Sequence, residues 1–151
     1  MTLLLEVSNV TKQFGGLVAV NRVTFDLVEN EILGLIGPNG AGKTTLFNVI
    51  NGVYPPTSGQ IRFNGEDVTN KKTYEMAHLG LARTHQIVKP LSELSVRDNV
   101  IVGGCYGGNG MSLGDAGKVA DEVMDFVGLH LRGEQLAGSL NVAQKKRLEL
   151  A

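Results

Sequence analysis

The sequence contains only one cysteine, Cys105, so it cannot form an internal disulfide, and we expect this thiol to serve in packing. Long apolar runs are also missing, because the longest, residues 3–5 and 32–36, fall far short of the ~20 residues of a membrane-spanning helix. The first residues lack the basic start of a signal peptide. The formal charge of −1 provides no basic excess for nucleic acid. These absences predict one soluble, cytosolic domain, whose 42% hydrophobic content is enough for a core.

Four segments of the first half carry strand patterns, and they are residues 5–8, 23–27, 32–36 and 60–65. The first two alternate apolar with polar side chains, as strands with one wet face in an antiparallel sheet do. The third is apolar throughout, which favours a strand covered on both faces. It runs into a glycine-rich turn and then a helix with apolar Leu46, Val49 and Ile50. Gly52 is the expected end of that helix.

The second half has helical patterns. Ser95 and Asp98 resemble a capping pair at the start of one helix. After the glycine-rich residues 103–110, a second helix is expected to end at Gly128. Its apolar residues at helical spacing are Val119, Val123, Phe126 and Val127. The sequence therefore predicts a β-rich first part and a mainly helical second part.

A glycine-rich loop provides the strongest functional signal. The spacing of Gly37-Pro38-Asn39-Gly40-Ala41-Gly42-Lys43-Thr44-Thr45 is that of a phosphate-binding loop, in which backbone N–H groups converge on phosphate oxygens. Lys43 would reach the β and γ phosphates, and the Thr44 hydroxyl would ligate Mg²⁺. The expected strand before the loop and helix after it make a chance match rare. The candidate nucleotide-binding residues here are Gly37, Asn39, Gly40, Ala41, Gly42, Lys43, Thr44 and Thr45.

Such a loop is shared by kinases, GTPases, motors and transport ATPases, so the rest of the chain must indicate which of these classes applies. The ATP-binding cassette (ABC) family resembles this chain from its start to its end, notably in GPNGAGKTTLFNVINGVYPPTSGQIRFNGEDVT. The ATPase subunits of branched-chain amino acid importers are the most similar members, in LEVSNVTKQFGGLVAVNRVTF and QKKRLELA. The resemblance implies an α/β fold with a RecA-like P-loop NTPase core and an antiparallel β subdomain over residues 1–91. A helical subdomain would occupy residues 92–151, and the C-terminal part of the core sheet would be missing.

The resemblance assigns further roles residue by residue. Phe14, in Lys12-Gln13-Phe14, matches the aromatic residue that stacks on adenine, although an aromatic residue is otherwise more often part of the core. Gln86 matches the glutamine that touches Mg²⁺, the attacking water and the membrane partner, although a single Gln is usually a surface residue. His85 stands where Phe is commoner in the family, and we interpret it as structural or solvated.

The family's signature LSGGQ corresponds here to Leu140-Asn141-Val142-Ala143-Gln144. In the family this segment binds the γ-phosphate held by the opposite subunit of a head-to-tail dimer. Asn141 and Gln144 are therefore predicted nucleotide contacts; Asn141 can cap a helix and offer an amide to phosphate. The basic run Lys145-Lys146-Arg147 is interpreted as a solvated helix face rather than a nucleic-acid site.

Hydrolysis needs an acidic residue at the end of a second apolar strand and a group that positions the nucleophile. Neither Glu6, after residues 3–5, nor Asp125, inside a helical pattern, stands in the right place. In the family these groups follow the signature, and this chain stops at Ala151. We therefore expect a truncated cassette that binds ATP and Mg²⁺ without efficient turnover, with Lys43 and Gln86 as its catalytic residues in the longer protein.

The leading interpretation is the ATP-binding subunit of an importer, peripheral on the inner face of the cell membrane. Its expected partners are transmembrane permease subunits and a second ABC ATPase subunit, with no nucleic acid. Three alternatives stay open: a non-transport ABC ATPase, an ATP-binding module without catalysis, and a small-molecule kinase. Residues 86–140 are too short and irregular for the coiled coils of the first alternative. For the small-molecule kinase, the sequence offers no acceptor site or lid.

Overall fold

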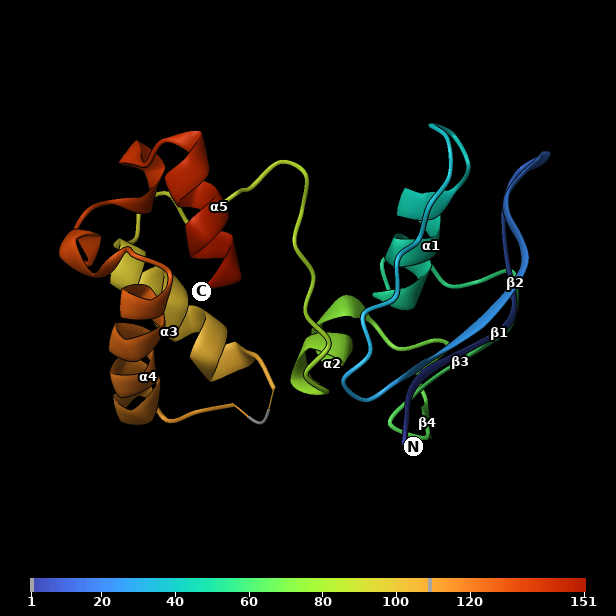
Figure 1. Ribbon diagram of the computed structural model, residues 1–151, viewed down its shortest axis with the longest axis horizontal. Coiled ribbons are helices and arrows are strands. Elements are labelled where there is room, and N and C mark those ends of the chain that lie inside the picture. Colours follow the sequence, from blue (N-terminus) through green and yellow to red (C-terminus); the bar gives the residue numbers. More distant parts are fainter. Residues whose placement is uncertain (1, 109) are drawn as a thin grey trace. The chain divides into compact units, whose positions relative to one another are not determined.

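The computed structural model describes residues 2–108 and 110–151 (Figure 1). The chain forms two compact units, the first ending at Met76 and the second running from Ala77 to Ala151. The expected subdomain boundary after residue 91 stays a prediction. We describe each unit by itself.

The first unit contains a four-stranded antiparallel sheet in the order β2-β1-β3-β4. The strands are β1 (Leu3–Phe14), β2 (Leu17–Val28), β3 (Ser58–Phe63) and β4 (Glu66–Asp67). Alternation in β1 buries Leu5 and Val7 on one face, so the predicted antiparallel sheet is confirmed. The turn at Asn64-Gly65 is also confirmed, with positive φ at both residues, as a tight hairpin turn requires.

Helix α1 (Lys43–Ile50) follows the glycine-rich loop, and α2 (Thr73–His78) ends the first unit and begins the second. The three apolar residues predicted to lie on the inner face of α1, Leu46, Val49 and Ile50, are all buried. Gly52 ends this helix region as predicted, with φ 71°. A side chain there would place its Cβ 2.4 Å from the Lys71 carbonyl oxygen, so only glycine fits.

The apolar segment 32–36 does not form the predicted strand. It is an irregular connection between β2 and α1 (Figure 1), and Ile32 and Ile36 are 99% and 95% exposed. A strand covered on both faces needs neighbours that accept its backbone hydrogen bonds and cover its side chains. In the described part of the chain, no strand pairs with this segment. The prediction is wrong here because strand formation depends on those partners.

The second unit is helical. Its elements are α3 (Val96–Tyr106), α4 (Leu113–Phe126), the 3-10 turns η1 (His130–Arg132) and η2 (Ala137–Ser139), and α5 (Val142–Leu150). The predicted cap of α3 is confirmed, because the Asp98 N–H donates to Ser95 Oγ at 3.0 Å. Cys105 is partly buried and packs against the core of this unit, as expected.

The buried face of α4 differs from the predicted one. Phe126 is 91% exposed, whereas Ala116, Ala120 and Met124 are buried. Val123 and Val127 pack against the same core as predicted. The small alanines allow α3 and α4 to approach closely, and their weak hydrophobicity hid this face from a search for large apolar residues.

We expect Met124→Ala to destabilise the second unit by about 2–5 kcal/mol, because Met124 is 3% exposed and its truncation leaves a cavity. Phe126→Ala, two positions away, should change the free energy of unfolding by at most about 0.5 kcal/mol. Urea denaturation followed by circular dichroism measures both values. A larger loss from Phe126→Ala than from Met124→Ala would contradict the orientation of α4.

Candidate nucleotide-binding site

The glycine-rich loop ends at a helix start that is open to an anion. Gly42 occupies the N-cap position of α1 without a side-chain cap, and the first turn contains no acidic residue. The first N–H groups of a helix lack intrahelical partners, and the helix dipole favours negative charge there. Thr44, in this first turn, is exposed, so its hydroxyl is accessible to a metal bound with phosphate. The start of α1 therefore suits phosphate oxygens.

Lys43 forms two hydrogen bonds to the backbone of the loop. Its ammonium group donates hydrogen bonds to the carbonyl oxygens of Gly37 and Pro38, the second at 2.7 Å. These bonds fold the side chain back over the loop instead of leaving it in open solvent. The predicted contact of Lys43 with the β and γ phosphates stays a prediction.

Two glycines of the loop, Gly40 and Gly42, both have φ 84°. A side chain would have different consequences at the two positions. A Cβ on Gly42 would lie 2.1 Å from the Ala19 carbonyl oxygen, so the end of the loop packs directly on β2. A Cβ on Gly40 would meet no atom within 4 Å. Gly42 thus anchors the loop to the sheet, while Gly40 leaves open space beside the backbone N–H groups.

Phe14 lies at the end of β1, where it pairs with Leu17 of β2. It is 41% exposed, so it is not a core residue. Ala19, which contacts Gly42, follows Leu17 by two residues, or about 7 Å along a strand. The predicted adenine-stacking residue and the phosphate loop therefore lie on the same unit and at the same end of the β1–β2 hairpin.

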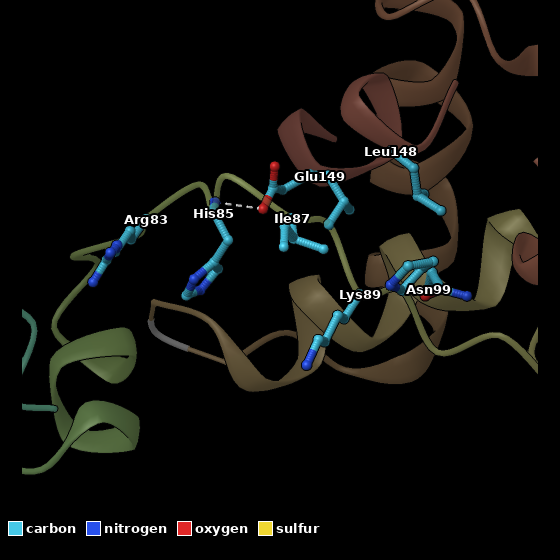
Figure 2. Close-up of a pocket in the computed structure, with 9 residues that line it drawn as sticks. Arg83, His85, Ile87, Lys89, Asn99, Leu148 and Glu149 are labelled. Carbon is cyan, nitrogen blue, oxygen red and sulfur yellow. Dashed lines mark hydrogen bonds between the residues drawn. The ribbon is translucent and has the colours of Figure 1, made fainter. Parts of the chain in front are cut away.

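Gln86 belongs to the second unit and lies exposed in an irregular segment. Its neighbours His85 and Ile87 line a cavity of about 550 Å³, together with Leu148 and Glu149 of α5 (Figure 2). The His85 backbone N–H donates to Glu149 Oε1 at 2.6 Å, the bond drawn in Figure 2. The segment that carries Gln86 is thus tied to the helix that follows Asn141.

Lys146 completes this connection. Its ammonium group donates to the His85 carbonyl oxygen and lies 3.1 Å from Glu149 Oε2. One member of the basic run 145–147 therefore has a structural role, and the run is not simply the solvated face that the sequence suggested. The signal in the sequence was the spacing of Lys146 and Glu149, which places them on one side of a helix.

The connection at Glu149 predicts a dependence on pH. Burial raises the pKa of Glu149, but the hydrogen bonds from His85 and Lys146 outweigh it, so the pKa is lowered. A carboxylate with a lowered pKa stabilises the fold above its unfolded pKa and loses this effect as pH falls through the folded value. Glu149→Gln should therefore lower the free energy of unfolding by about 1 kcal/mol near neutral pH. The difference from wild type should shrink as the pH falls below the ordinary glutamate range and through the lowered pKa of the folded state. Urea denaturation of both proteins at several pH values measures this difference in the free energy of unfolding. A difference that does not change with pH would contradict the prediction.

Asn141 and Gln144 bind each other at the start of α5. The Gln144 N–H donates to Asn141 Oδ1 at 2.9 Å, and the Asn141 N–H donates to Gln144 Oε1 at 3.0 Å. This is a capping box, and the Asn-x-x-Gln spacing was its signal in the sequence. The arrangement leaves the N–H groups of Val142 and Ala143 and the Asn141 amide NH₂ for a ligand. The predicted contacts of Asn141 and Gln144 with nucleotide stay predictions.

The predicted site residues are divided between the units, with Phe14 and the loop in the first and Gln86, Asn141 and Gln144 in the second. Within residues 2–108 and 110–151, no group of three or more His, Cys, Asp or Glu side chains could hold a metal ion. The predicted metal contacts of Thr44 and Gln86 stay predictions. None of the described helices is long and apolar enough to cross a membrane.

A glycine loop closed by a lysine at a helix start, beside a sheet, defines a P-loop nucleotide-binding protein. The sequence profile of the ABC transporter family matches residues 20–151, so the chain belongs to this family. The family resemblance and the α/β P-loop fold predicted from the sequence are thereby confirmed. The family binds nucleotides.

Two relatives and one solved structure illustrate the similarity. The high-affinity branched-chain amino acid transport ATP-binding protein BraF of Pseudomonas aeruginosa is 36% identical, over 98% of this chain and 63% of BraF. The ribose import ATP-binding protein RbsA of Halalkalibacterium halodurans is 34% identical, over 99% of this chain and 30% of RbsA. A crystal structure of the ADP conformation of an ATP-binding cassette of an ABC transporter is 30% identical, with a TM-score of 0.83 over 99% of this chain and 63% of that one. The chain thus spans less than two thirds of these relatives.

Proposed function

We propose that the chain binds Mg-ATP as part of the ATP-binding subunit of an importer. The observation that supports this most strongly is the loop around Lys43, with its cation held over the loop and its open space at Gly40. Similarity to ATP-binding proteins of two import systems supports the transport role.

The residues of the first unit suggest how ATP would be held. The N–H groups from Gly40 to Thr44 would bind the phosphate oxygens, and Lys43 would neutralise their charge. Thr44 would supply a hydroxyl ligand to Mg²⁺, which contributes charge neutralisation at the phosphates when bound. Phe14 would stack on the adenine ring. During hydrolysis the Gln86 amide would orient the attacking water, and Asn141 and Gln144 would contact the nucleotide of the opposite subunit.

Transmembrane permease subunits and a second ATPase subunit are the proposed partners, which would place the protein on the inner face of the cell membrane. The cavity beside Gln86 supports a docking role for the second unit. It combines the exposed apolar Ile87 with the basic Lys89, so it offers both hydrophobic contact and charge to a partner segment.

Branched-chain amino acids are the proposed cargo. This proposal rests on similarity to BraF, while similarity to RbsA supports a sugar as the alternative. Deletion of the gene in its native cell, followed by uptake of radiolabelled leucine and ribose, distinguishes the two. We expect leucine uptake to fall and ribose uptake to persist. The reverse pattern would replace the amino acid with a sugar, and no change in either would reject both.

A further inference from the structure

Two other residues hold the ring of Phe14. The Tyr54 ring meets it at 83°, with the ring centroids 5.3 Å apart. The Lys12 ammonium nitrogen lies 5.0 Å from the centroid of Phe14 and 5.8 Å from that of Tyr54. Edge-to-face aromatic pairs and cations over aromatic rings are both attractive. We call Lys12, Phe14 and Tyr54 the aromatic platform.

Hydrogen bonds fix the chain on which the aromatic platform is built. The Lys12 ammonium group donates to the Pro55 carbonyl oxygen at 2.8 Å. The Gln13 N–H donates to Thr57 Oγ1 at 3.0 Å, and the Thr57 N–H donates to the Thr11 carbonyl oxygen at 2.8 Å. The loop after Tyr54 is therefore fastened to the end of β1 at three points, and the two rings have little freedom to separate.

The aromatic platform is also connected to the phosphate loop. The Tyr54 N–H donates to the Asn48 carbonyl oxygen of α1 at 3.4 Å, and α1 begins where the phosphate loop ends. On the other side, Phe14 pairs with Leu17, and Ala19 of the same strand contacts the loop. Two short paths of chain, hydrogen bonds and packing contacts thus link the ring and the loop, so their separation is set before any ligand binds.

The platform is held rigidly and yet is open to a ligand. Phe14 and Tyr54 are 41% and 38% exposed. Packing that only served stability would bury these rings, because removing apolar surface from water stabilises the folded state. A fixed, accessible ring beside a phosphate loop suits a ligand that combines a flat base with phosphates, which is a nucleotide.

We propose that Tyr54 and Lys12 are positioning residues for the nucleotide base, because they preorganise the Phe14 ring on which the base stacks. This inference rests on the proposed ATP-binding function. A ring that is already ordered loses little conformational freedom when the base binds, so more of the stacking energy appears as affinity. Loss of Tyr54 should therefore weaken the base-dependent part of binding and leave the phosphate-dependent part intact.

Inorganic tripolyphosphate separates the two parts, since it offers phosphates without a base. We would titrate Mg-ATP and Mg-tripolyphosphate into the wild type, Tyr54→Ala, Tyr54→Phe and Lys12→Met by calorimetry. We expect Tyr54→Ala to weaken ATP binding about fivefold and Lys12→Met about threefold, with tripolyphosphate affinity unchanged within about twofold. Tyr54→Phe keeps the edge-to-face ring and should bind both like the wild type.

Each other outcome decides against a specific claim. Equal losses for ATP and tripolyphosphate in Tyr54→Ala would show a merely structural role and overturn the inference. Unchanged ATP affinity in Tyr54→Ala would overturn it as well. A wild type that binds tripolyphosphate as tightly as ATP would reject the aromatic platform and leave the phosphate loop standing. A wild type that binds neither would reject the proposed function itself and this inference with it.

Discussion

Lys43→Ala should abolish most of the rise in melting temperature that Mg-ATP causes in the wild-type chain. A ligand that binds only the native state stabilises it by about 2.7 kcal/mol at a concentration one hundred times its dissociation constant. For a chain of this size, that corresponds to a rise of about 5–10 °C. Lys43 holds its ammonium group over the loop carbonyl oxygens of Gly37 and Pro38, so its removal takes away the only side-chain cation placed on the loop among the described residues.

Differential scanning calorimetry with and without Mg-ATP measures this shift. Lys118→Ala is the matched control, because Lys118 is an exposed lysine of the second unit, with a side chain 81% exposed. The control should keep the full shift, and both variants should melt like the wild type without nucleotide. An undiminished shift in Lys43→Ala would show that ATP binds elsewhere on the chain.

Gly42→Ala should destabilise the first unit by about 3–5 kcal/mol, while Gly40→Ala should cost only about 1–2 kcal/mol. Both residues have φ 84°, so both substitutions introduce the same strain of a left-handed backbone. Only at Gly42 would the new Cβ also collide with the Ala19 carbonyl oxygen, at 2.1 Å. The difference between the two variants therefore isolates the contact between the loop and β2.

Urea denaturation without nucleotide measures both free energies, and the pair is its own control for backbone strain. Equal losses at the two positions would show that β2 yields easily and does not position the loop. A loss at Gly42 that is larger by at least about 2 kcal/mol would establish that the sheet holds the loop in place.

The phosphate loop and its helix could be predicted because their signals are local. Gly42, Lys43 and Thr44 are adjacent, and the helix after them shows its buried face through Leu46, Val49 and Ile50. The Ser95 cap is local in the same way, since donor and acceptor lie three residues apart. Backbone sterics and short-range hydrogen bonds determine such features without help from distant residues.

Other features depend on residues far apart in the chain. Residues 32–36 have the composition of a buried strand, yet a strand requires partners, and none of the described strands pairs with them. The tie between His85 and α5 joins residues that are 61 and 64 positions apart, which no local pattern reveals. The family resemblance indicated Phe14 as the base contact, but nothing in the sequence indicated that Tyr54 and Lys12 hold its ring.

The sequence by itself determined the phosphate loop, the antiparallel strands and several helix ends, because these follow from short-range geometry and hydrophobic period. Its resemblance to known proteins indicated the family. Only the tertiary structure decided which face of α4 is buried, which residues support Phe14 and how the segment of Gln86 is attached to α5. These depend on packing and hydrogen bonds between distant segments, whose energies are set by the positions of both partners in space.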